Sequence, residues 1–138
     1  MNTNYKKLHL NIKNIFKKHK LSSSHAKICA DALINAELVG APSHGLSRLK
    51  MYCDRINKKV INPKPKIKIK KISQSITHID ANNSIGFVAA DIGIKKAISN
   101  AKKTGIGLVA IKNISKSISI VDADNSIGFV AAQIGIKK

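Results

Sequence analysis

The sequence has few residues of the kinds that read nucleic-acid bases. It contains no tryptophan, five phenylalanine and tyrosine residues in all, and two arginines, Arg48 and Arg55, among 25 basic residues. Sequence-specific binding uses arginine forks that read guanine and aromatic rings that stack on bases. Despite the net charge of +18, we therefore expect no specific nucleic-acid partner, and only weak, salt-sensitive binding of polyanions.

Cysteines and long apolar stretches are also scarce. Cys29 and Cys53 lack CxxC spacing and fall in helical apolar patterns, so we expect buried, reduced thiols and no metal site. No apolar stretch approaches the roughly 20 residues that span a bilayer. No secretory hydrophobic region precedes His44 either. We expect a cytoplasmic protein with no membrane partner.

The spacing of apolar residues predicts three helices in the first part of the chain. Apolar positions recur at three- and four-residue steps from Tyr5 to Lys20, from the serines at 22–24 to Gly40, and from near Ser43 to before Asn62. The serines offer N-caps for the second helix, and Gly40 ends it. Residues 1–63 therefore read as an N-terminal helical segment.

Strand patterns follow this helical segment. Residues alternate between apolar and polar from Lys64 to Lys71, and short β-branched runs cover Ser75–Asp80 and Gly107–Ile111. A turn at residues 81–83 and a helix ending near Lys103 are expected between the last two runs. Residues 64–113 therefore form a strand, strand, helix, strand block. The fold class is α/β (α+β), with a small mixed sheet and packed helices in one domain.

The end of the chain repeats an earlier block. Residues 117–138 match residues 75–96 at 17 of 22 positions, at a constant offset of 42. Two copies are too few for a repeat architecture, which needs three or more units to bury a continuous core. Both copies carry the same strand, turn and helix preferences, so they compete for one place in the sheet. We expect residues 114–138 to pack poorly or to pair with another chain.

A polar stripe in the predicted third helix is the strongest candidate site. His44, Arg48, Tyr52 and Arg55 recur at helical spacing, and Ser43 precedes them. Such a group could hold a small carboxylate-bearing substrate, because a guanidinium matches two carboxylate oxygens. A solvated helix face would show the same spacing. The residues alone leave both interpretations open.

One longer pattern resembles a known family. The phrase ADALxxAExxGxxSHGLxRLxMYxxRIxxxxINP from residue 30, followed by TGIGLVAIKN at residues 104–113, is similar to the type 2 malate/L-lactate dehydrogenases, which include ureidoglycolate and sulfolactate dehydrogenases. The resemblance covers about four fifths of the chain. It implies a fold distinct from the Rossmann fold, and a chain that is truncated relative to the family.

The resemblance also implies an activity and roles for particular residues. Members interconvert 2-hydroxy acids and 2-oxo acids with NAD or NADP, and they work as homodimers. Arg48 would hold the substrate carboxylate, Ser43 and Tyr52 would line the substrate pocket, and His44 is the candidate catalytic residue. The family's proton-transfer histidine corresponds to Lys116 here. Residues that bind the cofactor are unknown, since the sequence has no GxGxxG pattern and no P-loop.

These departures from the family pattern lead to three competing expectations. The first is an inactive fragment of a 2-hydroxy-acid dehydrogenase, which does not bind NAD or NADP well by itself. The second is a non-enzymatic remnant that associates with itself. The third is a weak polyanion-binding protein, an expectation that rests only on the net charge of +18.

Overall fold

The computed structural model describes residues 2–115 and 128–133. The chain divides into two compact units, Met1–Lys64 and Pro65–Lys138. Together they contain helices and a mixed sheet, which confirms the predicted mixed α/β class. No helix among the described residues combines the length and apolarity that a membrane span requires.

The first unit is built on two packed helices, α1 (Asn2–Lys18) and α2 (Ser23–Leu38). The side chain of Ser22 caps α2 by accepting a hydrogen bond from the backbone N–H of His25 at 3.2 Å. Both helices bury one apolar face, as an amphipathic helix on a core should. The fully buried side chains of these two helices are Ile12, Phe16, Ala26, Cys29, Ala30, Leu33 and Ile34.

The third predicted helix is shorter than expected and is preceded by two 3₁₀ turns. These turns are η1 (Pro42–His44) and η2 (Leu46–Arg48), and the helix α3 (Leu49–Asn57) follows them. Gly45 separates the turns with φ −95° and ψ −133°, which is not a helical conformation. The prediction of one continuous helix from near Ser43 was therefore wrong. The spacing of apolar residues is the same whether or not one glycine between them leaves the helical conformation.

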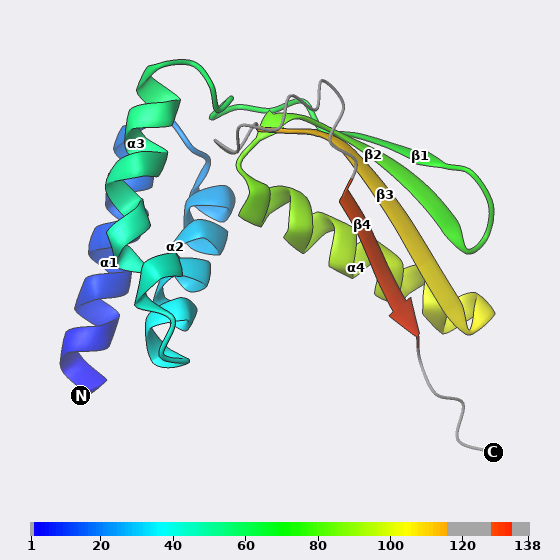
Figure 1. Cartoon of the computed structure of the whole chain (residues 1–138), viewed down its shortest axis with the longest axis horizontal. Helices are drawn as coiled ribbons and strands as arrows, with labels where there is room; N and C mark the ends of the chain where they lie inside the picture. The colour runs from blue at the N-terminus through cyan, green and yellow to red at the C-terminus, as the bar shows by residue number, and fades with distance from the viewer. Residues whose placement is uncertain (1, 116–127, 134–138) are drawn as a thin grey trace. The chain divides into compact units, whose positions relative to one another are not determined.

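The second unit is a four-stranded sheet with one helix against it (Figure 1). Its elements are β1 (Lys68–Lys71), β2 (Ile76–Ser84), α4 (Gly86–Thr104), β3 (Ile106–Ile114) and β4 (Gly128–Gln133). The strand order is β1-β2-β3-β4, with β2 and β3 parallel and both outer pairs antiparallel. The helix α4 makes the crossover that a parallel pair needs.

Alternate residues of β2 and β3 form the core of this unit. Thr77, Ile79 and Ala81 alternate with more exposed residues along β2, and Val109 and Ile111 do the same along β3. These side chains share one face of the sheet, as the two-residue period requires. They cluster with Ala89 and Ala97 of α4, and the side-chain amide of Asn100 donates to Thr77 Oγ1 at 2.9 Å.

The turn expected at residues 81–83 lies within a strand. β2 continues to Ser84, and its register against β3 shifts between Asp80 and Ser84. Asn82 and Asn83 have φ of 49° and 57°, a conformation that asparagine tolerates better than most residues. The asparagines thus mark an irregularity in the strand instead of its end.

The duplicated block adopts different structures in its two copies. The sequence GFVAA begins α4 at residue 86 and lies in β4 at residue 128. The second copy therefore differs from its expected helix at these residues. The five residues GFVAA are too few to show either a helical or a strand period. In the second copy, the pairing of β4 with the edge of β3 accompanies the strand structure. The remainder of the second copy, residues 117–127 and 134–138, lies outside the described residues.

Candidate functional site

The candidate site lies on the connection between α2 and α3. Gly40 follows α2 with φ 75°, the left-handed conformation that glycine adopts at helix ends. The N–H of Ala41 then donates to the carbonyl of Ala36 at 2.8 Å, which closes the helix end. Pro42 starts η1 directly after this closure. Gly40 and Pro42 therefore set the direction in which the chain leaves α2, and the predicted site residues follow directly after them.

A carboxylate from α2 holds the centre of this connection. Glu37 Oε1 accepts a hydrogen bond from the backbone N–H of Leu46 at 2.6 Å. Gly45 is buried against the same carboxylate, and a Cβ added to Gly45 would collide with it. Glu37 thus ties together η1 and η2, which carry His44 and Arg48. Residue-by-residue reasoning missed Glu37, although it belongs to the AExxGxxSHG phrase.

Ser43, His44 and Arg48 are brought together by direct contacts. Ser43 Oγ and His44 Nδ1 lie 3.0 Å apart, and Arg48 Nε donates to the carbonyl of Ser43 at 2.7 Å. A guanidinium N–H of Arg48 also reaches Met51 Sδ at 3.8 Å. All three predicted residues are exposed. Ser43 and His44 lie in η1 and Arg48 lies in η2, with the non-helical Gly45 between them, so they do not share one helical stripe.

Tyr52 lies one turn into α3 and is half-buried. Burial raises the pKa of its phenol, while the positive charges of Arg48 and Arg55 act in the opposite direction. The phenol is protonated at physiological pH, so its hydroxyl can donate a hydrogen bond. The fourth member of the predicted stripe differs, because Arg55 is only 8% exposed. Arg55 therefore does not belong to an exposed polar face.

This arrangement is suited to binding a small anion. The bond from Nε to the Ser43 carbonyl orients the guanidinium plane of Arg48, and an oriented guanidinium can bind a carboxylate with two hydrogen bonds. The imidazole of His44 is held beside Ser43 through the contact between its Nδ1 and Ser43 Oγ. Lys116, the residue that the resemblance places at the position of a proton-transfer histidine, lies outside the described residues.

The described residues offer no metal centre. No group of three or more His, Cys, Asp or Glu side chains in this part of the chain is placed to hold a metal ion. Burial raises the pKa of the Cys29 thiol to about 12, so this cysteine stays protonated and unreactive at neutral pH.

Comparisons with known proteins point to one family. Residues 3–117 match the family described as malate/L-lactate dehydrogenase. The L-sulfolactate dehydrogenase of Methanocaldococcus jannaschii is 39% identical over 107 residues, which cover 78% of this chain and 30% of that protein. The malate dehydrogenase of Pyrococcus abyssi is 47% identical over 85 residues, covering 62% of this chain and 24% of that protein.

Solved structures agree with these sequence matches. The malate dehydrogenase of Pyrococcus horikoshii OT3 superposes with a TM-score of 0.77 at 37% identity, covering 80% of this chain and 32% of that one. The chain thus spans about a quarter to a third of the length of the relatives it matches.

Proposed function

This chain belongs to the malate/L-lactate dehydrogenase family, and from this membership we propose that it supplies the substrate-carboxylate wall of a 2-hydroxy-acid dehydrogenase. The family's activity is that of an oxidoreductase, as the names malate dehydrogenase and L-sulfolactate dehydrogenase state. Malate and sulfolactate both carry a carboxylate next to a hydroxyl-bearing carbon. A wall that binds this shared carboxylate would serve either substrate.

In the proposed site, Arg48 binds the substrate carboxylate. The observation that carries this role is the hydrogen bond from Arg48 Nε to the Ser43 carbonyl, because it orients the guanidinium before substrate arrives. Such preorganisation lowers the entropic cost of binding. Ser43 and Tyr52 line the pocket as hydrogen-bonding groups, and His44 is the candidate catalytic residue at the reacting oxygen.

We further propose that the intact enzyme uses NAD or NADP, and that this chain alone binds neither well. Relatives named for each cofactor exist, a ureidoglycolate dehydrogenase (NAD(+)) and a (2R)-3-sulfolactate dehydrogenase (NADP(+)). The proposal of weak binding rests on the sequence, which has no GxGxxG pattern. In that pattern, glycines let the backbone approach the phosphates of a dinucleotide closely.

The architecture is proposed to be distinct from the Rossmann fold, with residues 1–63 as a three-helix segment that carries the substrate pocket. The mixed strand directions support this proposal, because a Rossmann sheet is mostly parallel.

We also propose a cytoplasmic homodimer. The first unit exposes the apolar side chains of Leu10, Leu38 and Val39, at 54%, 54% and 69%. These exposed side chains support the proposal that a second subunit covers part of this surface in the assembled enzyme.

The purified chain should show no oxidation of NADH or NADPH with oxaloacetate, pyruvate or sulfopyruvate. The expected result follows from the lysine at position 116, where the resemblance places a proton-transfer histidine, and from the lack of a GxGxxG pattern. Absorbance at the nicotinamide band measures it directly. Turnover that disappears in an Arg48→Ala variant would contradict the inactive-fragment proposal, while turnover unaffected by Arg48→Ala would contradict the proposed site.

A further inference from the structure

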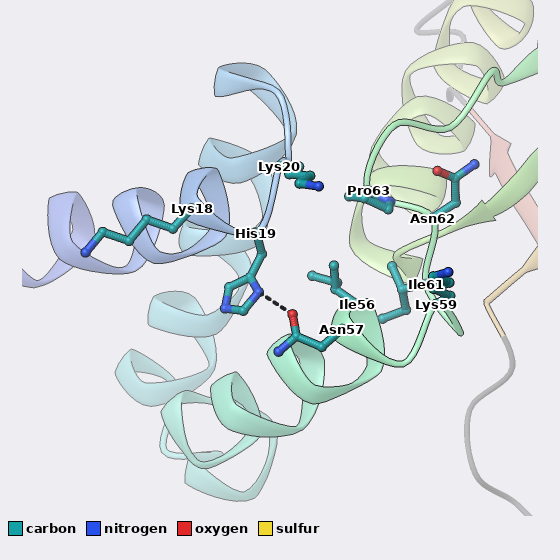
Figure 2. Close-up of a pocket in the computed structure, with 9 residues that line it drawn as sticks. All are labelled: Lys18, His19, Lys20, Ile56, Asn57, Lys59, Ile61, Asn62 and Pro63. Carbon is teal, nitrogen blue, oxygen red and sulfur yellow. Dashed lines mark hydrogen bonds between the residues drawn. The ribbon is translucent and has the colours of Figure 1, made fainter.

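A pocket in the first unit lies at the C-terminal ends of α1 and α3 and is lined by basic, polar and apolar residues. It has a volume of ≈ 450 Å³, within the range of small-molecule sites. None of its lining residues carries a carboxylate. Those residues are Lys18, His19, Lys20, Ile56, Asn57, Lys59, Ile61, Asn62 and Pro63 (Figure 2).

Two lysines of this pocket occupy positions that lysine rarely takes. The N–H of Lys20 donates to Lys17 O at 2.9 Å and the next N–H, of Leu21, to Phe16 O at 3.2 Å, the closing pattern of a helix C-terminus. Lys59 and Val60 close α3 in the same way, on Ile56 O and Arg55 O, both at 3.0 Å. At this position the backbone is left-handed, with φ of 69° at Lys20 and 60° at Lys59, and glycine or asparagine is usual.

The rest of the chain follows the usual preference. The corresponding residues after α2 and α4 are glycines, Gly40 and Gly105, with φ of 75° and 80°. The other described non-glycine residues with positive φ are asparagines, at 82, 83 and 113. Lysine therefore replaces the less strained residue at the two helix ends that line this pocket. Charge at the helix ends does not explain the choice, because Lys17, Lys18 and Arg55 already lie in the last turns.

The remaining lining groups suit a ligand with one anionic and one apolar end. Ile56 and Ile61 are 7% and 1% exposed and form an apolar floor with Pro63. The imidazole N–H of His19 donates to Asn57 Oδ1 at 3.0 Å, which holds both polar side chains at the edge (Figure 2). The nearby carboxylate of Asp54 is engaged by Lys50 at 2.7 Å and does not line the pocket.

We propose that this pocket binds a small organic phosphate, with the phosphate between Lys20 and Lys59 and the apolar part on Ile56, Ile61 and Pro63. Lysine ammonium groups bind phosphate as mobile point charges. Placing them at left-handed positions costs folding free energy, which is consistent with selection for a ligand.

Phenyl phosphate is the probe for this proposal, titrated into the full chain in 150 mM NaCl and followed by NMR. We expect shifts of the His19, Asn57 and Ile61 amides, and affinity about tenfold above that for inorganic phosphate, because the ring covers the apolar floor. The double variant Lys20→Gly/Lys59→Gly should bind about tenfold more weakly. It should unfold at an equal or higher temperature, because the backbone strain is relieved.

The matched control is Lys6→Gln/Lys7→Gln, which removes the same charge from exposed positions of α1. It should leave the affinity within about twofold. A second variant, Lys20→Asn/Lys59→Asn, tests the same loss with another residue that tolerates this backbone. Equal weakening in the control and the glycine variant, no shifts at the pocket, or equal affinity for phosphate and phenyl phosphate would each overturn the proposal.

Discussion

Arg48→Ala should lower kcat/KM for malate by about 10²- to 10⁴-fold in a chimera where residues 3–113 of this chain replace the matching segment of Pyrococcus horikoshii malate dehydrogenase. Two hydrogen bonds from a guanidinium to a carboxylate are lost, each worth about 1.5–3 kcal/mol. The change should lie mainly in KM, because the carboxylate is bound equally in the ground and transition states. Steady-state kinetics of the chimera measure the effect.

Two further variants make this test specific. Arg48→Lys keeps the charge but loses the planar fork, so its kcat/KM should fall between those of the parent chimera and Arg48→Ala. Lys50→Ala removes an exposed cation that pairs with Asp54 at 2.7 Å, and should change kcat/KM by less than about threefold. An Arg48→Ala effect no larger than that of Lys50→Ala would rule out the proposed clamp.

Gly107→Ala should destabilise the second unit by about 3 kcal/mol. Gly107 is buried in β3 against α4, and an added Cβ would collide with the backbone carbonyl of Ala97 and lie 2.9 Å from the backbone nitrogen of Ala101. Backbone atoms cannot move aside as a flexible side chain can, so strand and helix must separate. Urea unfolding followed by far-UV circular dichroism measures the loss.

Gly86→Ala is the matched control for this substitution. An added Cβ at Gly86 would meet Ile114 Cγ2 at 3.8 Å, an ordinary contact, and the residue begins α4. Alanine is favoured over glycine in a helix, so stability should stay equal or rise by up to about 1 kcal/mol. Comparable losses in the two variants would mean that the close packing of β3 on α4 is not what Gly107 provides.

The sequence predicts the mixed α/β class because most elements follow strong local signals. Alternation of apolar residues marks the core face of β2, and Gly105 ends α4 in a left-handed conformation. Two features depend on tertiary contacts that no local pattern contains. The interruption at Gly45 arises from packing against Glu37, and β4 takes its structure from the edge of β3.

The candidate site is predictable in its residues but not in its geometry. The SHG phrase and Arg48 identify the residues, whereas their proximity comes from two 3₁₀ turns interrupted at Gly45 instead of a helical stripe. Glu37 was missed because a single carboxylate at the end of an amphipathic helix reads as a solvated residue. Only its 2.6 Å bond to the Leu46 N–H shows that it holds the turn.

Titration of the full chain with malate in 150 mM NaCl, followed by NMR of the Ser43–Arg48 amides and the Arg48 side chain, tests the central claim most directly. The claim is that this turn binds a 2-hydroxy-acid carboxylate through Arg48. We predict shifts that saturate at these residues, that need a higher malate concentration in a folded Arg48→Lys variant and that disappear in Arg48→Ala, while Lys50→Ala retains them. Absence of shifts at the turn, or equal binding by Arg48→Lys, would contradict the account.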